Sequence, residues 1–131
     1  MCGIIGYTGG SPALSMVIES LRKLEYRGYD SAGIALTSKS GEKLIVAKRA
    51  GKLSNLESAL TSDHADSLSG IGHTRWATHG GPTDENAHPH ISSDGKVAVI
   101  HNGIIENYLE LKAELEKRGH KFSSQTDTES V

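Results

Sequence analysis

Residues 1–10, MCGIIGYTGG, contain a short isoleucine-rich run that closes on Thr-Gly-Gly, the pattern of a strand that meets a loop. Cys2 therefore stands at the head of a predicted strand, and it is the only cysteine among 131 residues. A cysteine that serves only for packing can lie in any core strand. The position of Cys2 beside the chain terminus, directly before Gly3, suggests that the terminus itself has a role.

Removal of Met1, a routine step when the second residue is small, would leave Cys2 with both a free amine and a thiol. An α-amine has a pKa of about 7.7 to 8.0 and a thiol one of about 8.5. Near neutral pH the amine can therefore act as a base, and the thiol is a strong nucleophile. The alternative is that Cys2 is a small apolar residue at the start of a strand, because cysteines are often simply buried.

Beyond this first strand, predicted helices and strands alternate along the chain. Ser11 and Pro12 match an N-cap and a first helical residue, and apolar residues spaced three and four apart carry this helix to about Gly28. The other predicted strands cover residues 33–37, 43–48, 69–76, 97–101 and 120–124, and the other predicted helices cover 54–60 and 104–119. This order predicts one α+β or layered α/β domain.

Local signals add detail to these elements. Gly41 is expected to be the left-handed residue of a hairpin turn, and residues 97–101 have the continuous apolar character of a buried strand. The long polar stretch at residues 77–90 is a loop of the length that usually carries function. Residues 126–129, Thr-Asp-Thr-Glu, have the form of a capping box that opens a further helix.

Composition excludes several classes of function. The chain has 14 Lys and Arg against 16 Asp and Glu, a formal charge of −2, so no overall field recruits nucleic acid or an anionic membrane. One cysteine allows neither an intrachain disulfide nor a multi-cysteine zinc site. No apolar run approaches the roughly 20 residues that span a bilayer. Because only Met1 precedes Cys2, no leader is expected and a cytoplasmic location follows as the default.

Five other residues have the right chemistry for an acyl-transfer site. Asn102 and Gly103 follow the predicted strand 97–101 and could donate to an oxyanion, although Asn-Gly is also a common turn. Arg75, at the end of a strand, could bind a carboxylate through two hydrogen bonds, or be a solvated surface residue. Trp76 could be a core indole or a lid. Asp127 could accept from a substrate ammonium or favour a helix N-terminus.

Five of the seven histidines lie between residues 73 and 101: His73, His79, His88, His90 and His101. Histidine is the commonest metal ligand, so a non-catalytic metal-binding module is a rival hypothesis. No HExxH pattern and no second cysteine support it, and we predict no metal.

Six blocks of the sequence, in the same order, closely resemble the amino-terminal glutaminase domain of the glutamine–fructose-6-phosphate aminotransferases, which are N-terminal-nucleophile (class II) glutamine amidotransferases. The blocks are MCGIIG at 1–6, LEYRGYDSAG at 24–33, HTRWATHG at 73–80, NAHPH at 86–90, HNGIIEN at 101–107 and TDTE at 126–129. The terminal cysteine and the Asn-Gly pair are shared with other class II amidotransferases, so the acceptor of the ammonia is inferred from the family alone.

The resemblance implies a role for each site residue. Cys2, first in the chain once Met1 is removed, attacks the glutamine amide through its thiol, and Asn102 and Gly103 donate to the oxyanion. Arg75 holds the substrate carboxylate and Asp127 the ammonium. Thr78 and His79 line the glutamine pocket, and Trp76 belongs to a closing loop. No cofactor is implied.

The resemblance also implies a fold, an αββα sandwich of two antiparallel sheets that needs more residues than this chain has. We therefore expect residues 1–131 to be the first part of the amidotransferase domain, incomplete at the C-terminus, with the sugar-isomerase domains absent. Glutamine is the expected partner, fructose 6-phosphate would bind only to the missing domains, and the full-length family is expected to be homo-oligomeric. The remaining alternatives are another class II amidotransferase and an inactive fragment that only associates with other chains.

Overall fold

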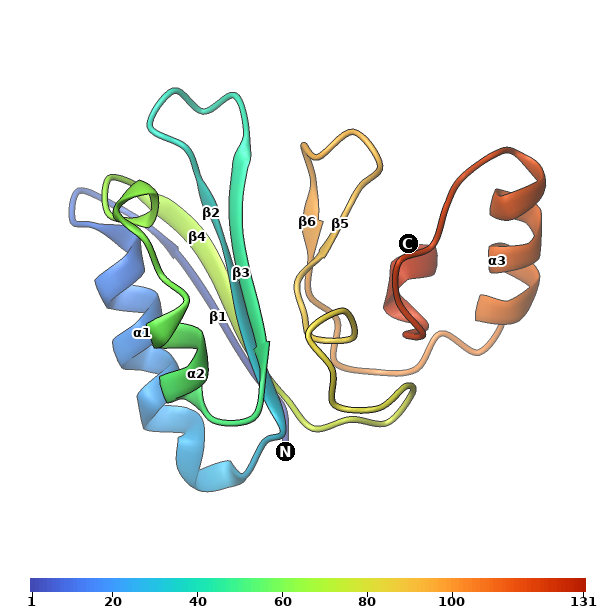
Figure 1. The fold of residues 1–131 in the computed structure, drawn as a ribbon, viewed down its shortest axis with the longest axis horizontal. Coiled ribbons are helices and arrows are strands. Elements are labelled where there is room, and N and C mark those ends of the chain that lie inside the picture. The colour runs from blue at the N-terminus through green and yellow to red at the C-terminus, as the bar shows by residue number, and fades with distance from the viewer.

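A four-stranded antiparallel sheet with the order β1-β4-β2-β3 forms the centre of the computed structural model, which describes residues 1–131 (Figure 1). Its strands are β1 (Gly3–Thr8), β2 (Ser31–Thr37), β3 (Leu44–Ala50) and β4 (Ser69–Arg75). Gly3 pairs with Thr74, and Ser31 pairs with Arg75. The start of the chain and the end of β4 therefore lie at the same end of the sheet.

Helices α1 (Ala13–Leu24) and α2 (Leu53–Ser58) cover one face of this sheet (Figure 1). The hydrophobic core lies between them and the strands, and its largest fully buried side chains include Leu21, Ile34, Leu36, Leu53 and Leu56. Gly72 faces α1, because a Cβ built on it would lie 2.4 Å from a side-chain atom of Val17. Since side chains alternate along a strand, Thr74 shares the face of Gly72, whereas His73 and Arg75 project from the opposite face.

The second half of the chain lies on that opposite face. It contains a two-stranded antiparallel sheet of β5 (His90–Ile91) and β6 (Ala98–Val99), then α3 (Tyr108–Lys117) and a 3₁₀ turn at Thr128–Ser130. Figure 1 shows the β5–β6 hairpin beside the main sheet, with the C-terminal segment between this hairpin and α3. A Cβ on Gly33 of β2 would lie 2.0 Å from the backbone oxygen of His88. The absence of a side chain at residue 33 therefore lets the segment before β5 pack directly on the sheet.

Most predicted elements of the first half are confirmed within a few residues. Gly41 has a φ of 74° in the turn between β2 and β3, as expected. The helix after β1 starts at Ala13 with Pro12 as its cap, and no side chain makes a capping hydrogen bond, so the cap predicted at Ser11 is wrong. A 3₁₀ turn (Glu25–Arg27) follows α1, and Gly28 with a φ of 76° then redirects the chain into β2.

The predictions for the second half were less accurate. Of the buried strand expected at 97–101, only Ala98–Val99 forms a strand, because its partner strand β5 is only two residues long. Val97 is 56% exposed, so the predicted burial is wrong at this residue. No strand forms at 120–124. There the Glu129 carboxylate accepts the backbone N–H groups of Ser123 and Ser124, each at 2.7 Å.

The prediction of a capping box at residues 126–129 is also wrong. Because its Glu129 is engaged by Ser123 and Ser124, that carboxylate does not reach back to the backbone of Thr126, whose hydroxyl bonds His90 instead. Only the short 3₁₀ turn forms. None of the helices is both long enough and apolar enough to cross a bilayer.

Candidate active site

A cavity of about 390 Å³ opens at the end of the sheet where the chain begins. Seven of the eight residues singled out from the sequence line it: Cys2, Arg75, Trp76, Thr78, Asn102, Gly103 and Asp127. The eighth, His79, is not part of the wall, and its ring packs edge-on against Tyr108 with 5.6 Å between the ring centroids. The fold thus brings together residues from the start of β1, the end of β4, the segment after β6 and the C-terminal segment.

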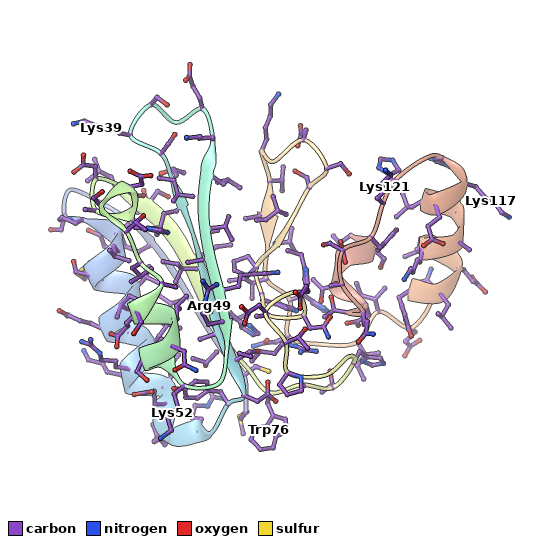
Figure 2. All side chains as sticks on the ribbon, viewed as in Figure 1. Lys39, Arg49, Lys52, Trp76, Lys117 and Lys121 are labelled. Carbon is purple, nitrogen blue, oxygen red and sulfur yellow. The ribbon has the colours of Figure 1, made fainter.

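Cys2 lies beside the backbone of the residue that follows β4. Its sulfur accepts the N–H of Trp76 at 3.1 Å and lies 3.6 Å from the Trp76 carbonyl oxygen. An N–H donated to sulfur stabilises a thiolate, which is the nucleophilic form. The indole of Trp76 is 54% exposed, and Figure 2 shows it at the lower edge of the molecule, next to the start of the chain.

Met1 precedes Cys2, so the N-terminal ammonium of this chain belongs to Met1. Its ammonium donates to the carbonyl oxygens of Arg27 and Gly28 at 2.9 and 2.8 Å. The positive φ of Gly28 places this turn against the site, and a Cβ there would lie 3.6 Å from the Trp76 ring. The turn after α1 therefore provides two carbonyl acceptors for an N-terminal ammonium.

Arg75 is 4% exposed, and the backbone of the long loop wraps its guanidinium. It donates to the carbonyl oxygens of His79 and Gly80 and, at 3.3 Å, to that of Gly81. Burial lowers the pKa of Arg75, while nearby Asp30, Cys2 and Asp127 raise it. An arginine guanidinium is not deprotonated in proteins, so the side chain remains a cation, and no carboxylate forms an ion pair with it.

Asp127, which lines the same cavity, is 4% exposed. Its Oδ2 accepts the N–H of Ile105 at 2.7 Å, and no protein group donates to its other side-chain oxygen. This carboxylate thus keeps acceptor capacity for a ligand, since an ionised carboxylate can accept several hydrogen bonds. The cavity therefore has a buried cation and a buried anion in its wall.

His73 forms a hydrogen bond with Asn102, a contact that was not predicted from the sequence. The Nε2 atom of His73 lies 2.7 Å from Oδ1 of Asn102. The His73 ring stacks on His88 with centroids 4.7 Å apart, and His88 contacts His90 at 4.6 Å. The only available signal was the two-residue spacing of His73 and Arg75, which places both side chains on one face of a strand.

Burial keeps these three histidines neutral. It lowers the pKa of His73 to about 4, that of His88 to about 2 and that of His90 to about 4, with neighbouring positive charges acting in the same direction. Although the rings are close, no group of three or more His, Cys, Asp or Glu side chains has a geometry that could hold a metal ion. The rival hypothesis of a histidine metal site therefore finds no support in this arrangement.

Residues 40–131 match the family model of the glutamine amidotransferase domain. The chain belongs to the glutamine amidotransferase family. This match covers more than half of the chain and includes every residue of the cavity wall that follows β3. The expected family is confirmed.

Curated relatives within the glutamine amidotransferase family extend over nearly the whole chain. The glutamine–fructose-6-phosphate aminotransferase (isomerizing) of Thermus thermophilus is 60% identical over 98% of this chain, which is 21% of its own length. The enzymes of the same name from Streptomyces coelicolor and Aquifex aeolicus are each 60% identical over 100% of this chain, and 21% and 22% of their own lengths. The chain thus spans about a fifth of the length of these relatives.

A solved structure with the same fold is the glutamine phosphoribosylpyrophosphate amidotransferase of B. subtilis, in complex with ADP and GMP. It superposes with a TM-score of 0.79 at 32% identity, over 99% of this chain and 28% of that one. The predicted α+β class with antiparallel sheets of the N-terminal-nucleophile amidotransferases is therefore confirmed. The higher identity to the glutamine–fructose-6-phosphate enzymes favours that branch over other class II amidotransferases.

Proposed function

We propose that this chain hydrolyses glutamine to glutamate and ammonia, with Cys2 as the nucleophile after removal of Met1. The observation that supports this most strongly is the shared cavity. The thiol of Cys2, the Asn102-Gly103 pair and the charges of Arg75 and Asp127 all line it, although they come from four separate segments. A chance cluster of this composition is improbable in a chain that also belongs to the glutamine amidotransferase family.

The charges in the wall match the groups of free glutamine, which has an α-carboxylate, an α-ammonium and a side-chain amide. Arg75 supplies the cation for the carboxylate, because three loop carbonyls do not use up the five N–H donors of its guanidinium. Asp127 supplies the anion for the ammonium through the oxygen that no protein group engages. Thr78 lines the same cavity and offers a hydroxyl, whereas His79 acts only through its backbone carbonyl to Arg75.

The proposed reaction proceeds in two halves. The Cys2 thiol passes its proton to the α-amine of the same residue and adds to the amide carbon, and the developing oxyanion accepts hydrogen bonds from Asn102 Nδ2 and the Gly103 N–H. Return of that proton to the departing nitrogen breaks the C–N bond, releases ammonia and leaves a thioester. Water, deprotonated by the same amine, then adds to the thioester carbonyl, and glutamate leaves as the thiol is restored.

The role of the chain in a longer protein is a further part of the proposal. We infer from the relatives that residues 1–131 are the N-terminal part of a glutamine amidotransferase type 2 domain. In a polypeptide of the relatives' length, the ammonia would be transferred to fructose 6-phosphate to give glucosamine 6-phosphate, through segments beyond those matched here. A cytoplasmic location and homo-oligomeric assembly belong to the same proposal.

The direct test is glutamate release from glutamine by the purified chain, compared with Cys2→Ala and with a chelator present. We expect release that survives the chelator and falls to background in Cys2→Ala. Cys2→Ser is the closer control, because it keeps the shape of the side chain and replaces only the sulfur. Release that persists in Cys2→Ala, or no release by a chain shown to have lost Met1, would refute the proposal.

A further inference from the structure

His73 occupies a fixed position in the wall of the candidate active site. It belongs to the four-stranded sheet, is 1% exposed and projects from the face opposite α1 and α2. Its ring stacks on His88 with an interplanar angle of 26°. The backbone of His88 in turn lies against Gly33 of β2. The ring is therefore held by regular structure on one side and by a packed segment on the other.

Asn102 has much less support of its own. It is an exposed residue in an irregular segment between the two-residue strand β6 and α3. The χ2 angle of an asparagine is broad and roughly two-fold, so a free carboxamide presents its oxygen or its NH₂ group to a ligand almost equally. An oxyanion donor must be oriented before the reaction. The contact of 2.7 Å from His73 Nε2 to Asn102 Oδ1 is the only side-chain hydrogen bond of Asn102.

The surroundings of His73 decide which of the two groups donates. Its other ring nitrogen, Nδ1, is buried and has no hydrogen-bond partner. A proton on Nδ1 would therefore be a buried donor without an acceptor, and orphaned buried N–H groups are rarer than under-used acceptors. The favoured tautomer of the neutral ring carries its proton on Nε2. This N–H then donates to an acceptor, which fixes Oδ1 rather than Nδ2 of Asn102 on the His73 side.

We propose that His73 is a positioning residue, whose Nε2–H binds Oδ1 of Asn102 and so turns the Nδ2 donor group into the cavity that contains Cys2. The inference rests on the proposed glutaminase function and extends it to a residue that acts only through another. His73 lines the same cavity, but its polar contact is with Asn102. Gly103 does not depend on it, because a backbone N–H has no side-chain rotamer.

The kinetic test compares His73→Leu, which removes the donor, with His73→Gln, whose amide N–H can replace Nε2–H. In the chain without Met1, we expect His73→Leu to lower kcat for glutamine hydrolysis about 10- to 100-fold and to change KM less than about threefold. The upper limit is set by the effect of deleting an oxyanion donor, about 100- to 1,000-fold. His73→Gln should recover most of the lost kcat.

Two further variants separate positioning from general damage. In Asn102→Ala the carboxamide is absent, so adding His73→Leu should cause little further loss of kcat. His64→Gln is the matched control, because His64 is also a buried histidine, 5% exposed, whose Nδ1 contacts only Thr61 in the turn at 61–64. It should lower stability without lowering kcat. The inference is overturned if His73→Leu keeps kcat within twofold, or if its loss multiplies fully with that of Asn102→Ala.

An NMR measurement tests the contact independently of activity. The ¹⁵N shifts of the His73 ring should show a neutral Nε2–H tautomer at pH 7, and the Asn102 carboxamide signals should move in His73→Leu but not in His64→Gln. A Nδ1–H tautomer would overturn the inference whatever the kinetics. A chain with the expected signals but no glutamine turnover would refute the proposed function and the catalytic part of the inference, while supporting the His73–Asn102 contact itself.

Discussion

At the scale of single residues, the candidate site contains one nucleophile and two charged side chains with which a ligand could form ion pairs. Cys2 is held by a backbone N–H, Arg75 by loop carbonyls and Asp127 by the N–H of Ile105. Each of these side chains is oriented by main chain, so each can be changed without removing a side-chain partner. This makes the roles of the charges open to test by isosteric substitution.

Asp127→Asn is the most selective of these substitutions. The variant keeps an oxygen that can accept the N–H of Ile105, but it loses the negative charge that would bind the substrate ammonium. We expect KM for glutamine to rise about 10- to 100-fold, the range of a charged hydrogen bond lost from a binding site, with a smaller change in kcat. Steady-state kinetics measure this. Asp94→Asn, at an exposed carboxylate in a turn outside the cavity, is the control, and an unchanged KM in Asp127→Asn would exclude the ammonium role.

The residue types of the site could be predicted from the sequence, but their contacts could not. Cys2, Asn102, Arg75 and Asp127 were recognised because their chemistry and their motifs are local in the sequence. The bond between His73 and Asn102 joins residues 29 positions apart and exists only once the sheet has formed, so no spacing reveals it. The same is true of His79, whose side chain the loop turns away from the cavity toward Tyr108.

At the scale of elements, the geometry of the site depends on how closely the segment before β5 lies on the main sheet. Gly33 in β2 permits that approach, because any side chain there would overlap the carbonyl of His88. The rings of His73 and His88 then stack, and His90 meets His88 edge-on, so that the three neutral rings form a layer, the histidine stack, between the sheet and the second half of the chain. Packing and protonation of this layer should both affect stability.

Gly33→Ala should destabilise the chain and weaken the site. The added Cβ would lie 2.0 Å from the His88 oxygen, so the segment must move away from the sheet, at a cost of about 1 to 3 kcal/mol for an overpacked interior. Urea unfolding and glutaminase kcat would both show the loss. Gly6→Ala, in β1 with open space around its Cβ position and no positive φ, is the matched control. Equal stability of the two variants would contradict the close packing seen here.

The histidine stack predicts a loss of stability in mild acid. The pKa of His73 and His90 falls from 6.5 to about 4, and that of His88 to about 2, on folding. Between about pH 6.5 and 4 the unfolded chain therefore binds more protons, so the free energy of unfolding should fall as pH falls through this window. Arg75 and Lys48 face the stack as positive charges, and Glu129 faces His90 as a negative one.

Chemical unfolding at pH 7, 6 and 5 measures this dependence. Glu129 does not change the free energy of unfolding in this pH range. Its pKa is lowered on folding, so the stability that it contributes is lost only below the ordinary glutamate value of 4.5. His88→Gln should flatten the dependence, whereas His120→Gln, at an exposed position, should leave it unchanged. A free energy of unfolding that is constant from pH 7 to 5 would show that the stack is not buried and neutral.

At the scale of the whole molecule, the two halves of the chain differ in how they are stabilised. All ten residues of the hydrophobic cluster belong to the first half. Helix α3 has no buried residue, and Ile104, Leu109 and Val131 are 62%, 66% and 79% exposed. The sequence correctly predicted a helix here from its apolar spacing, but it could not show whether that face has a partner, because a partner is a property of the tertiary structure.

Hydrogen exchange should reveal this difference. Amides of α1, which packs on the sheet, should exchange much more slowly than those of α3, because a ten-residue helix without buried contacts is marginal in water. The cation–π contact of Lys112 with Phe122, at 5.1 Å, adds only a little. Exchange followed by mass spectrometry resolves the two helices, and equal protection would mean that α3 is packed against something in solution.

The most direct test of the central claim is the intact mass of the chain before and after exposure to an electrophilic glutamine analogue, with and without excess glutamine. We predict a chain that has lost Met1 and gains one adduct, located on Cys2 and suppressed by glutamine. That result requires the nucleophile and the glutamine-binding groups to share one cavity. A chain that has lost Met1 but gains no adduct, or gains one that glutamine does not suppress, would contradict the assignment of this cavity as a glutaminase site.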